Sequence, residues 1–127
     1  MTFLDASYVV GIVDDQDKWH ARARALQPRI RTPVTTDLVL VEAVTIIGAR
    51  QGGKAARTLY RFFVDSCRVE YLDAVRIPAV MEEHLRYDGG LSVADTFSVV
   101  VMRALALKEI ASFDDDFDKV KGIHRLH

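Results

Sequence analysis

Four acidic side chains, far apart along the chain, are the residues whose types and positions best suit chemistry. They are Asp5, Glu42, Asp95 and Asp114. Carboxylates about 5 Å apart repel one another by roughly 3 kcal/mol per pair at an effective dielectric near 20. A divalent cation converts that repulsion into binding, and ligation by oxygen alone favours Mg²⁺ or Mn²⁺ over zinc. The four acids can therefore form a metal site if the fold brings them together.

Glu42 is the acid with the least ordinary surroundings. It lies in the segment 35–51, which predicts a helix because threonine and aspartate precede an apolar run that ends before Gly52. The residues three and four positions away are Leu38, Val39, Thr45 and Ile46, so no basic side chain on this helix can pair with Glu42. We expect a buried, unpaired carboxylate, which costs several kcal/mol and so indicates a role beyond structure.

Alternating apolar runs and amphipathic segments predict the architecture. Short strands are expected at 2–4, 31–34, 67–73, 109–113 and near 122–126. Helices are expected at 6–13, 17–26, 35–51, 54–65, 78–87 and 92–107. Strands separated by helices indicate an α/β fold, a central mainly parallel sheet flanked by helices, in one domain over residues 1–127.

The predicted elements put the acids at one edge of that sheet. Asp5 and Asp114 directly follow strands, and parallel sheets bind ligands at the carboxyl ends of their strands. Asp95 falls in the first turn of its helix, and Glu42 about two turns into its own. Structural alternatives exist: Asp95 with Ser92 matches a capping box, and Asp5 and Asp114 are also common turn residues.

Composition and missing motifs narrow the function classes. The net charge is −1, so nucleic-acid binding would need local basic patches, and the single cysteine, Cys67, fits a reducing cytoplasm. No basic leader opens the chain and no uncharged run exceeds eight residues, so a soluble cytoplasmic protein without a membrane segment is expected. The run 114–119 has the alternating aspartates of a calcium loop, but Lys119 stands where that loop needs glycine. No nucleophile elbow, phosphate loop or dinucleotide motif occurs, which leaves metal–carboxylate chemistry.

Three blocks, in order, resemble the PIN domain, specifically the toxin of a VapBC-type toxin–antitoxin pair. The blocks are "FLDASYVVGIVDDQDKWH", "TTDLVLVEAVTII" and "LSVADTFSVVVMRALALKEIASFDDDFDKVKGIHRL", and together they cover most of the chain. One departure is Ala6, where a threonine is common after the first aspartate, but the carboxylate itself is kept.

The resemblance implies a Mg²⁺-dependent endoribonuclease whose metal ligands are Asp5, Glu42, Asp95 and Asp114, with Mn²⁺ as a possible substitute. Asp5 and Asp95 are the preferred direct ligands, and Glu42 and Asp114 would orient water or hold a second ion. The resemblance also implies a homodimer that a small antitoxin inhibits by covering the acidic pocket.

Supporting residues follow from this interpretation. Ser7 and Ser112 are candidates to hydrogen-bond the carboxylates, and Asp116 can take the place of Asp114. Candidates for contact with RNA phosphates, at near-helical spacing, are Arg50, Lys54, Arg57 and Arg61. A solvated helix face explains these four equally well.

Two other interpretations remain at this point. A two-component receiver domain is also α/β, but it needs a second acid after the first strand, where this chain has Ala6. A catalytically inactive PIN-like binding module would keep the fold and lose the reaction.

Overall fold

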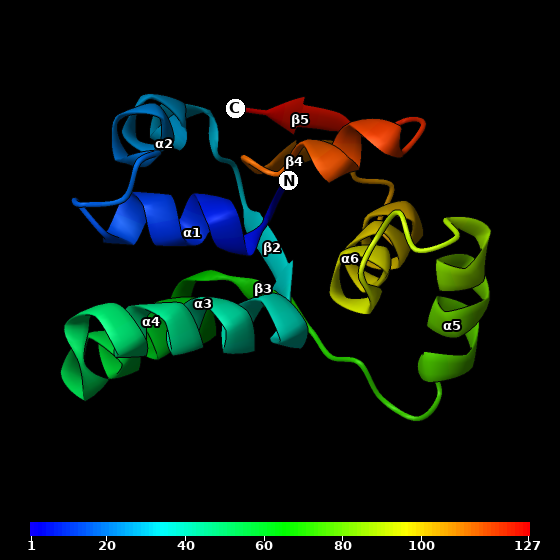
Figure 1. The fold of residues 1–127 in the computed structure, drawn as a ribbon, viewed down its shortest axis with the longest axis horizontal. Coiled ribbons are helices and arrows are strands. Elements are labelled where there is room, and N and C mark those ends of the chain that lie inside the picture. The colour runs from blue at the N-terminus through cyan, green and yellow to red at the C-terminus, as the bar shows by residue number, and fades with distance from the viewer.

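A parallel sheet organises the computed structural model, which describes residues 1–127 (Figure 1). Five strands pair in the order β3-β2-β1-β4-β5, and every pair is parallel. This arrangement confirms the predicted α/β class and the parallel sheet. The strands are β1 (Thr2–Leu4), β2 (Pro33–Thr36), β3 (Arg68–Glu70), β4 (Glu109–Ala111) and β5 (His124–Leu126).

Six helices cover the two faces of this sheet. They are α1 (Ala6–Val13), α2 (His20–Leu26), α3 (Asp37–Gln51), α4 (Gly53–Ser66), α5 (Ile77–Arg86) and α6 (Val93–Ala104), with 3₁₀ turns at Gln27–Arg29 (η1) and Asp115–Lys119 (η2). The chain moves from β1 to β3 in one direction and then returns past β1 to β4. Right-handed crossovers therefore put α1 to α4 on one face and α5 and α6 on the other, as Figure 1 shows. No helix is both long and apolar enough to span a bilayer.

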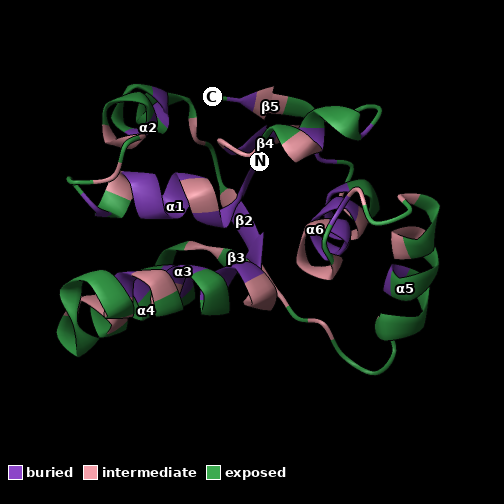
Figure 2. Ribbon diagram, viewed as in Figure 1, coloured by how far each residue is buried: buried purple, intermediate pink, exposed green.

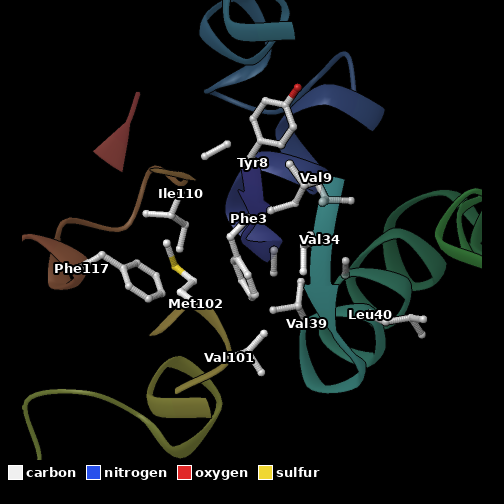
Figure 3. Close-up of a cluster of buried hydrophobic side chains, with 14 of the residues drawn as sticks. Phe3, Tyr8, Val9, Val34, Val39, Leu40, Val101, Met102, Ile110 and Phe117 are labelled. Atoms are coloured by element: carbon white, nitrogen blue, oxygen red, sulfur yellow. The ribbon is translucent and has the colours of Figure 1, made fainter. Parts of the chain in front are cut away.

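The core lies between the sheet and these helices. Phe3, Val34 and Ile110 from the three central strands are fully buried, and Met102 of α6 and Phe117 of η2 pack with them (Figure 3). Figure 2 shows the burial concentrated in the centre of the sheet, α1 and α6, while the edge strands β3 and β5 are less buried and α4 and α5 are largely exposed. The ends of the central strands therefore lie in the most buried part of the molecule.

Pairing of the central strand with its neighbours determines what meets at the carboxyl edge. Leu4 of β1 pairs with Ala111 of β4, so the next residues, Asp5 and Ser112, leave the sheet side by side. On the other side of β1, Thr36 ends β2 and caps α3 by accepting a hydrogen bond from the N–H of Val39 at 3.2 Å. One edge of the sheet thus holds the starts of α1, α3 and η2.

Element boundaries differ from the sequence prediction in a few places. The second helix begins at His20 rather than residue 17, because the Asp17 carboxylate accepts a hydrogen bond from the N–H of Trp19 and closes a turn. The third predicted strand shortens to Arg68–Glu70. The long apolar helix ends at Ala104, and Ala106 adopts a positive φ of 55° that a helix does not allow.

The cap of α3 leads to a stability prediction. Thr36→Ala removes a buried hydroxyl that satisfies a helix N–H, so it should lower the free energy of unfolding by about 1 kcal/mol. Thr45→Ala on the same helix is the control, because the Thr45 hydroxyl donates only to the Val41 carbonyl on an exposed face. That control should stay within about 0.5 kcal/mol of the parent by urea denaturation. Equal effects of the two changes would contradict the assigned cap.

Candidate metal centre

The four acids that the sequence analysis singled out line a single cavity. Asp5, Glu42, Asp95 and Asp114 all border a space of about 320 Å³ at the carboxyl edge of the sheet. Asp5 comes from the end of β1, Glu42 from α3, Asp95 from α6 and Asp114 from the turn that precedes η2. Four elements distant in sequence thus contribute one carboxylate each to what we call the acidic cavity.

Hydrogen bonds from two serines hold Asp5. The hydroxyls of Ser7 and Ser112 donate to Oδ2 of Asp5 at 2.6 and 2.7 Å. These serine oxygens in turn accept the backbone N–H groups of Phe113 and Asp114 at 2.9 and 3.0 Å. The network connects the ends of β1 and β4 and engages a single oxygen of Asp5. Oδ1 therefore remains for another partner.

The start of α6 explains how Asp95 reaches the cavity. Ser92 caps the helix, because its hydroxyl accepts a hydrogen bond from the N–H of Asp95 at 3.0 Å. No backbone N–H donates to the Asp95 carboxylate in return, so only half of the capping-box pattern forms. The cap fixes the backbone of Asp95, and its half-buried carboxylate borders the cavity instead.

Asp114 and Asp116 lie close enough to Asp95 to share an ion. One carboxylate oxygen from each of these three residues lies within 4.8 Å of the other two. Asp114 borders the acidic cavity, whereas Asp116 does not and forms an ion pair with Lys119 at 2.8 Å. Both candidates for the fourth acid are therefore near the site, and Asp114 has the more direct access to it.

Glu42 departs from one expectation. The sequence predicted a buried carboxylate, but the residue is exposed, because α3 turns this side toward the opening of the cavity. The Glu42 carboxylate forms no hydrogen bond and no ion pair, as the absence of basic neighbours on the helix predicted. The predicted lack of a basic partner for Glu42 is therefore confirmed, and the predicted burial of Glu42 was wrong.

The predicted basic residues occupy two different settings. Arg50 borders the acidic cavity, but its guanidinium donates to Asp14 at 3.0 Å and to Asp17 at 2.9 Å. The Gln16 N–H and then Arg50 hold the pKa of Asp14 below its usual range. This ion pair ties the turn after α1 to the end of α3. The other three, Lys54, Arg57 and Arg61, are exposed on α4 and border no cavity.

The turn between α1 and α2 supplies residues that sequence reasoning missed. Asp17, Lys18 and Trp19 all border the acidic cavity. The signal was the dense run "DDQDKWH", which mixes acids, a lysine and the only tryptophan. The sequence predicts a helix from residue 17, whereas α2 begins at His20, so Asp17, Lys18 and Trp19 belong to the turn that borders the cavity.

Comparison with protein families decides the assignment. A family model described as PIN domain matches residues 2–123. The chain belongs to the PIN domain family. Comparison with curated protein sequences finds no match. The receiver-domain alternative is therefore excluded, since one PIN domain accounts for nearly the whole chain.

This PIN domain is similar to solved structures of toxin–antitoxin proteins. VapC20 of Mycobacterium tuberculosis, a toxin that cleaves the sarcin–ricin loop, is 25% identical with a TM-score of 0.84, over 94% of each chain. FitAcB of Neisseria gonorrhoeae is 14% identical with a TM-score of 0.69, over 100% of this chain and 97% of its own. VapBC2 of Rickettsia felis, bound to a promoter DNA fragment, is 11% identical with a TM-score of 0.64, over 98% of this chain and 96% of its own. The family match and these similarities confirm the predicted resemblance to VapC-type PIN domains.

The electrostatics of this PIN domain reflect the crowding of its acids. Burial raises the pKa of Asp5, although the two serine hydroxyls oppose the shift. At Glu42, partial loss of solvent and then the charges of Asp5 and Asp114 raise the pKa. Burial, followed by the charges of Asp5 and Asp114, raises the pKa of Asp95 to about 7. The carboxylates of the acidic cavity are therefore poorly solvated when charged, and they repel one another.

This crowding predicts a pH-dependent stability. The Asp95 pKa of about 7 compares with an ordinary value of 3.8, so between these values the folded state binds more protons than the unfolded one. The stability of the metal-free protein should fall as pH rises through this window and level off above it. Asp95→Asn should remove this loss, raising the free energy of unfolding at pH 8 by at most about 4 kcal/mol and changing little below pH 4.

Denaturant unfolding from pH 4 to pH 8 in the presence of a chelator measures this effect. Asp65→Asn, on the exposed surface of α4, is the matched control and should leave the pH profile of stability unchanged. Parallel profiles for the parent and Asp95→Asn would contradict the assigned repulsion.

Proposed function

We propose that this PIN domain is a Mg²⁺-dependent endoribonuclease toxin, and that a small cognate antitoxin neutralises it. The observation that carries the proposal is the convergence of Asp5, Glu42, Asp95 and Asp114 on one cavity. Membership of the PIN family and the similarity to VapC20, a toxin that cleaves RNA, support the reaction class. Cleavage with and without Mg²⁺ separates this function from that of a catalytically inactive PIN-like module.

The donor set supports a hard divalent cation. All four acids offer oxygen, and no cysteine or histidine borders the cavity. Oxygen-only ligation suits Mg²⁺, with Mn²⁺ as a substitute, better than zinc. The raised pKa values of Asp5, Glu42 and Asp95 have mutual repulsion or burial as their cause, and a cation at the site would relieve both. Asp5 and Asp95 are the proposed direct ligands, with Asp114 or Asp116 beside them.

When bound, the cation lowers the pKa of water and neutralises charge that builds on the phosphate. The chain's own residues do the rest. Ser7 and Ser112 fix the Asp5 carboxylate through Oδ2 and leave Oδ1 without a hydrogen-bond partner. The Glu42 carboxylate, which has no hydrogen-bond partner, is proposed to hold and orient the attacking water and accept its proton. Partial burial, and then the charges of Asp5 and Asp114, raise the pKa of Glu42, which makes its carboxylate a stronger base.

The proposed protein partners are inferred from similarity to other PIN-domain proteins. VapC20 and VapBC2 are toxin–antitoxin proteins, which supports a small antitoxin that covers the acidic cavity of this chain. A homodimer is proposed on the family resemblance. Copurification with the product of a short neighbouring reading frame tests the antitoxin, and light scattering tests the dimer.

Neutralising single carboxylates should remove the activity and keep the fold. Asp5→Asn and Asp95→Asn should each lower Mg²⁺-dependent RNA cleavage at least about 100-fold, because even loss of a residue that supports a metal ligand costs 10- to 100-fold. Circular dichroism should show the parental fold. Asp65→Asn serves as the control and should cleave RNA like the parent. Near-full activity in either folded site variant would refute the ligand assignment.

The ends of the RNA products test the mechanism. A water nucleophile attacks phosphorus without the ribose 2′-hydroxyl, and no histidine borders the acidic cavity to serve as acid or base. His20 is instead engaged with the Gly11 carbonyl at 2.8 Å. Mass spectrometry should therefore find 5′-phosphate and 3′-hydroxyl ends, and cleavage should stop with a chelator. A 2′,3′-cyclic phosphate that survives chelation would disprove the metal mechanism.

A further inference from the structure

A second cavity adjoins the acidic one and has no role in the proposed cleavage step. It encloses about 350 Å³ and shares Trp19 and Asp114 with the acidic cavity. Its other walls come from α2, from the residues after β4 and from β5, and include Arg22, Phe113 and Arg125. Because β4 and β5 are parallel neighbours, this second cavity continues the same edge of the sheet.

An aromatic pair lies where the two cavities adjoin. The rings of Trp19 and Phe113 stack with centroids 5.0 Å apart and an interplanar angle of 9°. Trp19 is only partly buried, and it borders both cavities. Phe113 lies between Ser112 and Asp114, and its N–H donates to Ser7 at 2.9 Å. The backbone that positions the acids therefore also positions the stack.

Two unpaired cations lie over this stack. Lys18 Nζ is 5.2 Å from the Trp19 ring centroid, and the Arg22 guanidinium carbon is 5.6 Å from it. Neither side chain forms a hydrogen bond or an ion pair, whereas Arg50 and Arg125 are both engaged by aspartates. Lys18 borders the acidic cavity and Arg22 the second one. Each of the two adjoining cavities thus has one free positive charge at its border, close to Trp19.

We propose that the second cavity binds the base of the RNA nucleotide next to the scissile phosphate. This inference rests on the proposed ribonuclease function and assigns its substrate subsite. The base stacks on the open part of Trp19 and on the Arg22 guanidinium, while Lys18 and Arg22 contact the adjoining phosphates. The substrate is therefore single-stranded or unstacked at this position, because a base inside a helix cannot enter the cavity.

General properties of RNA recognition favour this occupant. Proteins read unpaired bases by stacking them on aromatic rings and arginine planes. A pocket of this size falls in the range that holds small organic ligands. The carboxylates of the acidic cavity repel phosphates, so free cations at its rim are needed to hold the backbone of the RNA. Lys18 and Arg22 meet this need at the border of the two cavities.

The test uses Asp5→Asn as a non-cleaving parent, with Mg²⁺ and a short single-stranded oligoribonucleotide. Trp19 is the only tryptophan, so its intrinsic fluorescence reports the proposed stacking directly. RNA should quench this fluorescence, and polyphosphate, which has charge but no bases, should not. Adding Arg22→Ala should weaken binding about 5- to 10-fold, as expected for loss of one stacking partner.

Matched variants separate stacking from charge. Arg24→Ala removes the same charge from an exposed site on α2 that borders neither cavity, and should weaken binding less than 2-fold. Arg22→Lys keeps the charge and should restore only part of the affinity. Equal effects of Arg22→Ala and Arg24→Ala, or equal quenching by polyphosphate, would refute the subsite.

Cleavage by the wild-type chain distinguishes failure of the subsite alone from failure of the proposed ribonuclease function. If Mg²⁺-dependent cleavage is present but Arg22→Ala binds RNA as tightly as its parent, only the subsite is wrong. If the wild-type chain cleaves no RNA and RNA leaves Trp19 fluorescence unchanged, the proposed function and the subsite both fail.

Discussion

Parallel pairing of β1 with β4 is the interaction on which the acidic cavity depends. These strands are far apart in sequence, and their register puts Asp5 beside Ser112 at the carboxyl edge of the sheet. The hydrogen bonds that follow hold an ionisable carboxyl group that is only 6% exposed. A shift of one residue would turn Ser112 to the opposite face and leave Asp5 without this partner. The apolar core around Phe3 and Ile110 opposes such a shift, because both side chains would lose the close packing that they have with their present neighbours.

The cavity costs stability, and the surrounding structure offsets that cost. Carboxylates that raise one another's pKa values destabilise the folded state at neutral pH. Helix caps at Thr36 and Ser92 and the ion pairs of Arg50 hold the acids together despite this repulsion. A site of this kind is already shaped for a cation, since the cation removes an unfavourable interaction in addition to forming new ones. Burial, and then the charges of Asp5 and Asp114, give Asp95 its high pKa although Ser92 caps its helix.

Local patterns predicted most of the fold and the four acids, but not the surroundings of those acids. Asp5 and Asp114 follow apolar strands, so their positions at the carboxyl edge could be derived from short stretches of sequence. Helical periodicity described the neighbours of Glu42 correctly, yet it does not say which side of α3 faces the cavity opening, and the expected burial was wrong. Trp19 precedes α2 and Phe113 follows β4, far away in sequence, so no local pattern contains their contact.

Charge links the two cavities in the proposed function. Without a cation, the carboxylates repel the scissile phosphate, and the neighbouring Lys18 and Arg22 attract the phosphates beside it. A bound cation removes the first effect and leaves the second, so cation and RNA should each strengthen the binding of the other. The coupling acts over a short distance, since Trp19 and Asp114 border both cavities. A net charge of −1 provides no general attraction for RNA, so the proposed function depends on local attraction by the free cations at this border.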